Sequence, residues 1–215
     1  MTLERSVMRE QIKELIIKRI LEGTYQPGQR VVELQLVQEL GVSQAPVREA
    51  LRDLEAMKFI ESEPYRGARV RQVTREELTE TYPVRAALEE LAGGMTGPVV
   101  DDGMLRMLET EIQNMLEAAR KQDQHGLLVH DARFHEIIVE GARNTVLLDC
   151  WSGLRIEAYT LVSMIRSHLD LIAIANAHLP ILDALRQRDG SLAGKVMREH
   201  IEHFASSLFG DEPDE

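Results

Sequence analysis

Two short helical patterns joined by a tight turn constrain the fold of this chain more than any other feature. Apolar side chains recur at helical spacing over residues 33–40, and Gly41 follows them at the turn. Ser43 is a good N-cap for a further helix, which we expect to end near Met57. Pro46 falls in the first turn of that helix, where a missing N–H costs little. The segment therefore predicts a helix–turn–helix.

The segments on either side complete a small domain. Before the helix–turn–helix, apolar residues at helical spacing predict a helix that ends at Gly23. After it, the short alternating runs 59–62 and 68–73 flank the turn-rich segment 63–67 and predict a β-hairpin. Helix, helix–turn–helix and hairpin in this order predict a winged helix–turn–helix over residues 1–73.

The remainder of the chain predicts helices throughout. Thr74 and Glu77 have the spacing of a capping box, which begins the first of these helices. Gly93-Gly94 is expected to end that helix early, and Asn144 and Asn176 are expected to cap later ones. The expected helices cover residues 74–91, 101–120, 126–141, 144–166, 176–188 and 191–208.

The expected fold is mainly α, with an N-terminal winged helix–turn–helix and a C-terminal all-α helical bundle. Aromatic residues make up only 4% of the chain, which fits an aliphatic core. We place the first domain at residues 1–73 and the second at residues 74–209. Residues 210–215 are expected to form a disordered tail.

The charge is distributed unevenly between these two domains. The chain has a net charge of −11, and an acidic average counts against binding to nucleic acid. Residues 1–75, however, hold 13 Lys+Arg against 11 Asp+Glu, whereas residues 76–215 hold 12 against 25. All seven His residues lie in the second part. The two domains are therefore expected to have different partners.

The cellular setting follows from what the sequence lacks. A single Cys excludes an intramolecular disulfide framework and fits a reducing compartment. No apolar run approaches the roughly 18 residues that a membrane-spanning helix needs. The first residues carry charge every few positions, unlike a signal peptide. We expect a cytoplasmic protein with no membrane partner.

One face of the third predicted helix is suited to DNA. Gln44, Arg48 and Arg52 are spaced four apart and therefore share that face. Arginine forks bind guanine edges or phosphates, and Gln can pair with adenine. On spacing alone an alternative is equally good, in which the two arginines pair with acidic residues on a solvated helix.

Three motifs resemble the DNA-binding domain of GntR-family transcriptional regulators. They are PGQR at 27–30, LGVSQAPVREALRDL at 40–54 and RGARV at 66–70. The resemblance implies that the recognition helix enters the major groove and that the wing tip reaches the minor groove. Many members carry Arg where this chain has Gln44. The DNA contacts carried over by position are Arg30, Ser43, Gln44, Pro46, Arg48, Arg52 and Gly67.

Acidic and histidine residues of the second domain form a candidate metal site. Asp131 and His135 are four apart on one predicted helix, and His178 and His200 lie on two later ones. One carboxylate and three imidazoles suit a divalent ion such as Zn, Ni or Mn. With seven His residues in this part of the chain, a chance grouping is the alternative.

The same residues resemble the effector domain of the FadR-type branch of the family. The motifs are VRAALE at 84–89, DARFH at 131–135, HLPILDAL at 178–185 and MREHI at 197–201. The resemblance implies that Asp131, His135, His178 and His200 hold a divalent metal beneath a small carboxylic acid. It also places Arg85 where it can clamp that acid, although a simple i,i+4 pair with Glu89 is an equal alternative. The metal set points away from an acyl-CoA ligand.

The resulting expectation is a metabolite-responsive transcriptional regulator, a repressor, that binds a palindromic operator as a homodimer. The second domain would bind the effector and form the dimer, and no residue is expected to be catalytic. Two alternatives remain: a DNA-binding module fused to a metal-dependent enzyme, or a bundle that serves only for dimerisation. Against an enzyme, the chain has no His-Glu-x-x-His segment.

Overall fold

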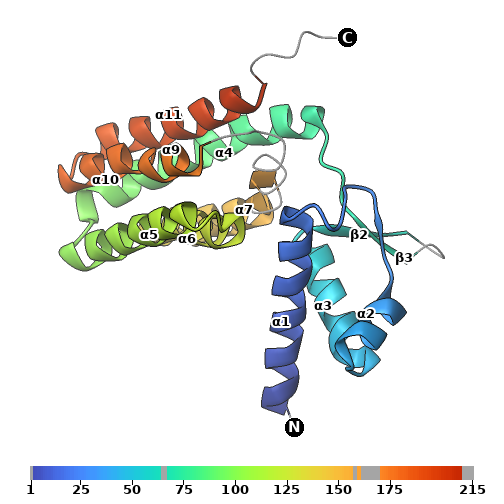
Figure 1. The fold of residues 1–215 in the computed structure, drawn as a ribbon. Coiled ribbons are helices and arrows are strands. Elements are labelled where there is room, and N and C mark those ends of the chain that lie inside the picture. The colour runs from blue at the N-terminus through green and yellow to red at the C-terminus, as the bar shows by residue number, and fades with distance from the viewer. Residues whose placement is uncertain (1, 64–66, 157–158, 161–169, 210–215) are drawn as a thin grey trace. The chain divides into compact units, whose positions relative to one another are not determined.

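The computed structural model describes the chain except for residues 1, 64–66, 157–158, 161–169 and 210–215 (Figure 1). The chain divides into two compact units, Met1–Gln72 and Val73–Glu215, which we describe separately. Among the described residues, no helix has both the length and the apolar character needed to cross a membrane.

The first unit combines helices with a small sheet, and the predicted winged helix–turn–helix is confirmed. Its elements are α1 (Thr2–Leu21), β1 (Arg30–Val31), α2 (Glu33–Leu40), α3 (Gln44–Ala56), β2 (Ile60–Glu63) and β3 (Gly67–Val70). The antiparallel sheet has the order β1-β3-β2, with Val31 opposite Ala68 and Ile60 opposite Val70. Strand β1 was not predicted, because two residues are too few to show alternation.

The turn between α2 and α3 fixes the geometry of the helix–turn–helix. Gly41 adopts φ +64°, a left-handed conformation that ends α2 and turns the chain sharply. Helix α3 then packs against α1, and Val47 and Leu54 of α3 and Ile16 of α1 are all fully buried. The opposite face of α3 is left exposed, and it carries the polar residues considered below.

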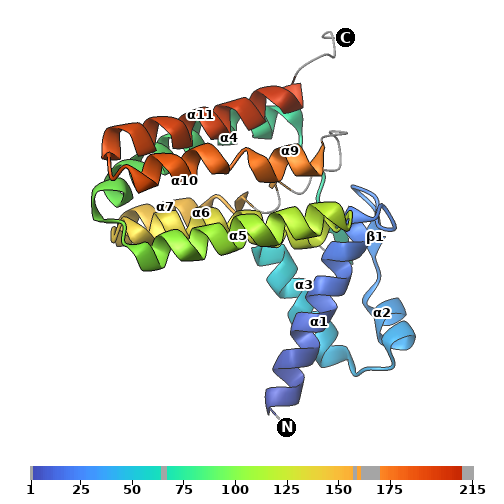
Figure 2. The ribbon, with the colours of Figure 1, turned by 60° about the vertical axis from the view of Figure 1, so that its left-hand side comes forward.

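The second unit is an all-helical bundle, as predicted. Its elements are α4 (Arg75–Thr96), the 3₁₀ turn η1 (Gly97–Val99), α5 (Asp102–Arg120), α6 (Gln124–Gly141), α7 (Thr145–Gly153), α9 (Leu171–Asn176), α10 (Leu179–Arg186) and α11 (Gly190–Phe209). Helix α4 lies beside α11 and helix α5 beside α6, as both ribbon views show (Figures 1 and 2). The buried core between them includes Phe134, Met115 and Ile138.

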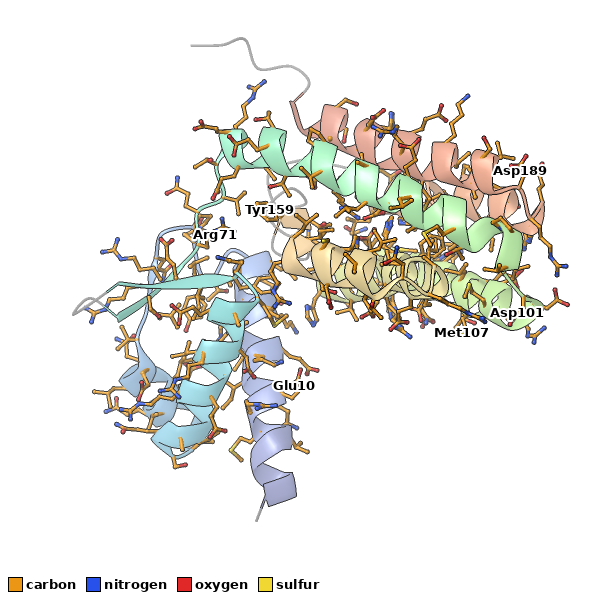
Figure 3. The ribbon with its side chains drawn as sticks, turned by 180° about the vertical axis from the view of Figure 1, so that it is seen from behind. Glu10, Arg71, Asp101, Met107, Tyr159 and Asp189 are labelled. Carbon is orange, nitrogen blue, oxygen red and sulfur yellow. The ribbon has the colours of Figure 1, made fainter. Side chains whose placement is uncertain are left out.

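Several helix starts have the caps that the sequence indicates. Thr74 accepts a hydrogen bond from the Glu77 amide, and the Glu77 carboxylate accepts one from the Thr74 amide, so the capping box is confirmed. Asp101 caps α5, and the Asn144 side chain caps α7. Asp189 caps α11 in the same way, and Figure 3 shows Asp101 and Asp189 at the same end of the bundle.

Three predicted helix boundaries are wrong. Helix α4 continues through Gly93-Gly94 to Thr96 instead of ending near residue 91. The helix that starts after Asn144 ends at Gly153, and Arg155 then adopts a left-handed φ of +54°, so it does not continue to residue 166 as one helix. Residues 157–158 and 161–169 of that prediction lie outside the described part of the chain.

The third error concerns the segment that carries His178. Asn176 is the last residue of α9 and does not begin a helix. His178 is instead the N-cap residue of α10, and Pro180 follows in the first turn of that helix, where it is well tolerated. The side chain of His178 therefore projects from a junction between two short helices.

Close packing against α11 explains why α4 continues through two glycines. A Cβ atom at Gly93 would lie 2.9 Å from the backbone oxygen of Ala193 and 2.9 Å from Cγ of Met197. The missing side chain lets the two helices approach closely, and this packing offsets the low helix propensity of glycine.

We predict opposite effects of alanine at the two neighbouring glycines. Both substitutions gain about 0.5–1 kcal/mol of helix propensity. Gly94→Ala should keep this gain, since its Cβ would meet only the Gly190 oxygen at 3.7 Å. Gly93→Ala should instead lower the free energy of unfolding by about 1–3 kcal/mol through overpacking. Urea unfolding of both variants measures the difference, and equal stabilities would refute the packing argument.

Candidate DNA-binding surface and candidate metal site

The first unit gathers most of the predicted DNA contacts on one surface. The groove between α2, α3 and the wing has a volume of about 510 Å³. Its lining includes five of the seven residues that the family resemblance implies. These five residues are Arg30, Gln44, Arg48, Arg52 and Gly67.

The wing brings Gly67 and Arg30 together. Gly67 has φ +81° at the start of β3, a conformation that a side chain would strain. A Cβ atom there would lie 3.6 Å from the guanidinium group of Arg30. The two residues therefore present one exposed cation beside a stretch of backbone that a ligand can approach closely.

Arg48 is held by a carboxylate of the neighbouring helix. Its Nε lies 2.9 Å from one carboxylate oxygen of Glu33 in α2, and its Nη2 donates to Oε1 of Gln44 at 3.4 Å. The acidic partner of Arg48 thus lies on α2 and not on α3 itself, where the sequence alternative placed it. Among the described residues, Arg52 makes no ion pair and stays exposed.

Ser43 and Pro46 differ from the other five. Ser43 is exposed at the N-cap of α3, and its hydroxyl makes no capping hydrogen bond. Pro46 is buried within the unit, and burial separates its ring from the exposed surface. The structure therefore does not place Pro46 among the accessible residues of this face.

The second unit brings three of the predicted metal ligands into contact. His135 lies on α6, His178 at the α9–α10 junction and His200 on α11. One ligand atom from each of the three lies within 4.8 Å of the others, and the ring centroids of His178 and His200 are 4.5 Å apart. His135 and His178 are fully buried and His200 is half-buried.

Asp131 contacts this cluster through His178. Its Oδ1 lies 3.1 Å from Nε2 of His178. His178 also has its Nδ1 3.0 Å from the carbonyl oxygen of Ile174, and a carbonyl can only accept, so Nδ1 carries the proton. In neutral His178 the Nε2 lone pair then faces the Asp131 carboxylate. Two acceptors in contact require a cation between them, either a proton or a metal ion.

Arg85 forms the i,i+4 pair with Glu89 that the sequence offered as an alternative, but the pair is buried. The Arg85 Nε donates to Oε1 of Glu89 at 2.7 Å, and Nη1 donates to the Thr160 hydroxyl at 3.4 Å. The Nε1 of Trp151 donates to the same Glu89 oxygen at 3.0 Å. Glu89 is fully buried, and sequence reasoning did not identify it as a site residue.

The charged states of these groups follow from their surroundings. Burial alone raises the pKa of Glu89, but the positive charge of Arg85 outweighs it and holds that pKa well below the ordinary range. Burial also raises the pKa of Asp131, and the close contact with His178 and the neighbouring His135 reverse the shift. Burial and the nearby histidines lower the pKa of His200, so its imidazole is neutral and has a free lone pair.

A small cavity adjoins the cluster. Its volume is about 130 Å³, and its polar lining residues are Arg85, Asp131, Thr160, Asp170, His178, His200, His203 and Ser207. Side chains of α9 and α11, among them Ile174 and Phe204, supply apolar walls. The cavity therefore places the guanidinium group of Arg85 against the same small space as His178 and His200 of the cluster.

The residues present fit a divalent metal ion. The Nε2 atoms of His135 and His178 are buried and have no hydrogen-bond partner among the described residues. Buried polar atoms without partners are costly, and a metal ion would satisfy both of them. Three imidazoles with a nearby carboxylate form a donor set that Zn, Ni and Mn accept.

A winged helix–turn–helix joined to a separate helical unit, with a small cavity beside a histidine cluster, is typical of ligand-controlled DNA-binding regulators. Comparison with known families agrees. The model of the "Bacterial regulatory proteins, gntR family" matches residues 8–70, and the model of the "FCD domain" matches residues 80–203. The chain therefore belongs to the GntR family of transcriptional regulators, in the branch with a C-terminal FCD domain.

Individual relatives support this assignment. A "Probable D-xylose utilization operon transcriptional repressor" of Paenarthrobacter nicotinovorans is 34% identical over 93% of this chain and 88% of its own length. A "Gluconate operon transcriptional repressor" of Bacillus licheniformis is 29% identical over 86% of this chain and 78% of its own. These relatives are regulators, and this chain is a regulator rather than an enzyme.

Solved structures show the same fold. E. coli McbR/YncC superimposes with a TM-score of 0.73 at 21% identity, over 94% of this chain and 97% of that one. A GntR regulator from Rhodococcus sp. RHA1 gives a TM-score of 0.71 at 23% identity, over 95% and 99%.

Proposed function

We propose that the chain is a metabolite-responsive repressor that binds a palindromic operator as a homodimer. A small carboxylic acid would bind at a divalent-metal site and lower or raise the affinity of the chain for this operator. The observation that carries this proposal is the cluster of His135, His178 and His200 beside a cavity that also contains Arg85. A regulator with these functions acts in the cytoplasm, where its operator DNA lies.

The DNA-binding surface supports direct reading of sequence. Arg48 and Arg52 project from α3 with the fork geometry that guanine edges and phosphates accept. The uncapped N-terminus of α3, with the free hydroxyl of Ser43, favours a phosphate. Arg30 and the backbone at Gly67 extend the surface along the wing. The buried Pro46 would act by shaping the first turn of α3 and not by contact.

An exposed apolar face supports the homodimer. Val84, Leu91 and Met95 are exposed on one side of α4, and Val146 is exposed near the start of α7. The Asn144 amide contacts the Met95 sulfur at 3.9 Å, so the start of α7 adjoins this side of α4. Apolar patches of this kind mark association surfaces. A two-fold dimer would match the symmetry of a palindromic operator.

The charges around the cavity favour a metal ion with a carboxylate ligand. Arg85 contributes one positive charge, and Glu89 and Asp131 contribute two negative charges, so these three buried side chains carry a net −1. A divalent ion would change the net charge to +1, and a monocarboxylate would then neutralise it. The metal would supply an open coordination position and positive charge for the acid.

The size of the cavity limits the effector. A cavity of about 150 Å³ accommodates a molecule of benzene size, and the cavity here is about 130 Å³. It suits an acid of a few carbon atoms and is too small for acyl-CoA. The relatives described above are named as repressors of D-xylose utilization and gluconate operons. Gluconate is a carboxylic acid larger than benzene, so it tests this size limit.

Selection of random duplex DNA by the full chain tests the proposal for DNA binding. We expect enrichment of an inverted repeat, bound by two copies of the chain in analytical ultracentrifugation. Enrichment of an asymmetric site by a single copy would contradict the homodimer, and no enrichment would contradict operator binding.

We predict that Arg52→Ala weakens binding to the selected site by about 1–3 kcal/mol, because a base-edge contact is lost. Titrations at one fixed salt concentration measure the effect. Arg120→Ala provides the control, since Arg120 is exposed on α5 in the other unit and should leave affinity unchanged. Equal affinities of the Arg52 variant and the control would remove Arg52 from the proposed surface.

A further inference from the structure

Glu89 is the buried carboxylate next to the histidine cluster that the proposed metal site does not use as a ligand. It lies on α4, is 0% exposed, and contacts one side chain of its own helix and one from each of two other helices. These partners are Arg85, Trp151 on α7 and His135 on α6. A buried carboxylate with this many partners is constrained in both position and orientation.

The two oxygens of Glu89 have different roles. Oε1 accepts hydrogen bonds from Nε of Arg85 at 2.7 Å and from Nε1 of Trp151 at 3.0 Å. Oε2 has neither of these donors and lies 2.6 Å from Nδ1 of His135, without an aligned hydrogen bond. The 2.6 Å separation is within hydrogen-bonding distance, so Oε2 is an acceptor within reach of Nδ1–H of His135.

His178 shows the same arrangement with a different acceptor. The Ile174 carbonyl accepts from its Nδ1, which leaves Nε2 free on the side of the cluster. For His135, Glu89 Oε2 occupies the corresponding position. In both residues an acceptor at Nδ1 therefore favours the tautomer whose Nε2 lone pair is available to a metal ion.

We propose that Glu89 is a positioning residue for the metal site: its Oε2 holds the proton on Nδ1 of His135 and directs Nε2 toward the ion. The proposal rests on the metal site of the proposed function. Groups that orient metal-ligating histidines in this way contribute about 10–100-fold in metal affinity. Because Glu89 also binds Arg85, it connects a residue of the cavity lining to a metal ligand.

The test compares two variants that differ only in the acceptor. Arg85→Met/Glu89→Leu removes both charges of the buried pair and leaves no acceptor for His135. Arg85→Met/Glu89→Gln removes the same charges but keeps an amide oxygen at the position of Oε2. Removing both members of a buried pair with similar volume is tolerated far better than removing one, so both variants should fold. Trp151→Phe serves as the control, because it removes a bond to Oε1 only.

Zinc affinity is measured on the full chain by competition with a chelating dye. We expect the Leu variant to bind zinc about 10–100-fold more weakly than the Gln variant, and Trp151→Phe to remain close to the unmodified chain. Long-range ¹⁵N–¹H spectra of the metal-free proteins should show His135 protonated on Nδ1 in the unmodified and Gln chains but not in the Leu chain.

The possible outcomes distinguish a failure of the positioning role of Glu89 from a failure of the metal site. Equal zinc affinities of the Leu and Gln variants, with the same His135 tautomer, would overturn the role of Glu89 and leave the metal site intact. Should Trp151→Phe lose as much affinity as the Leu variant, general packing would explain the effect and the positioning role would be overturned. An unmodified chain that binds no zinc would overturn the metal site and the positioning role together.

Discussion

His178→Ala is expected to abolish stoichiometric binding of a divalent metal by this chain. The imidazole of His178 contacts Asp131, and its ligand atom lies within 4.8 Å of the ligand atoms of the other two histidines. Removal of a residue that only orients a metal ligand lowers metal affinity by about 10–100-fold, and removal of the His178 ligand should lower it further. Metal analysis after purification without chelators and exhaustive dialysis measures the bound ion.

His130→Ala is the matched control for this variant. His130 also lies on the second unit, but its Nδ1 is 2.7 Å from Glu111, away from the cluster. The control should retain one equivalent of metal for each chain. Metal retained in full by the His178 variant would exclude this histidine from the site.

Arg85→Met is expected to produce the largest loss of stability. It removes one partner of a buried ion pair and leaves the Glu89 carboxylate without its charge partner in the core. Breaking a buried pair in this way costs about 3–5 kcal/mol, which corresponds to a Tm lowered by roughly 6–20 °C in a chain of this size. Thermal unfolding of the metal-free chain measures the change without a contribution from ligand binding.

Lys121→Met is the control that separates the effect of burial from the effect of i,i+4 spacing. Lys121 and Glu117 form an i,i+4 pair like Arg85 and Glu89, but on the exposed surface of the bundle. Lys121→Met should therefore leave the Tm almost unchanged, since exposed pairs contribute little. Similar Tm values for Arg85→Met and Lys121→Met would contradict the energetic difference that we assign to burial.

Local signals predicted much of the fold. The apolar spacing and Gly41 give α2 and its end, and the capping box at Thr74 and the cap at Asp101 mark where α4 and α5 begin. These features depend on residues within four positions of each other, so they can be read from the sequence. The winged helix–turn–helix followed by a bundle was predictable for that reason.

Non-local packing caused one of the errors, and a competing local cap caused another. Gly93-Gly94 has the composition of a helix end, but its fit against Ala193 and Met197 of α11 keeps α4 helical. Asn176 has the composition of an N-cap, but the preceding residues 171–175 are helical and Asp170 caps them. A local pattern cannot show which of two competing contacts the folded chain makes.

For both candidate sites, the sequence predicted some of the residues and missed their acidic neighbours. The histidines and Asp131 were identified by residue type and by resemblance to the FadR-type branch. The acidic neighbours were not identified as site residues, because Glu33 reaches Arg48 from α2 and Glu89 meets His135 across the bundle. The spacing of Arg85 and Glu89 is the same whether the pair is solvated or buried, so the sequence did not reveal that both lie in the core.

The central claim is that a carboxylic acid binds to this chain through a metal ion. The most direct test is thermal unfolding of the zinc-loaded chain with a panel of acids of two to six carbons that includes gluconate. We predict that at least one acid raises the Tm of the zinc-loaded chain, because ligand binding stabilises the folded state by mass action. The same acid should have no effect on the metal-free chain or on His178→Ala. Equal shifts with and without metal, or no shift with any acid of the panel, would contradict the account.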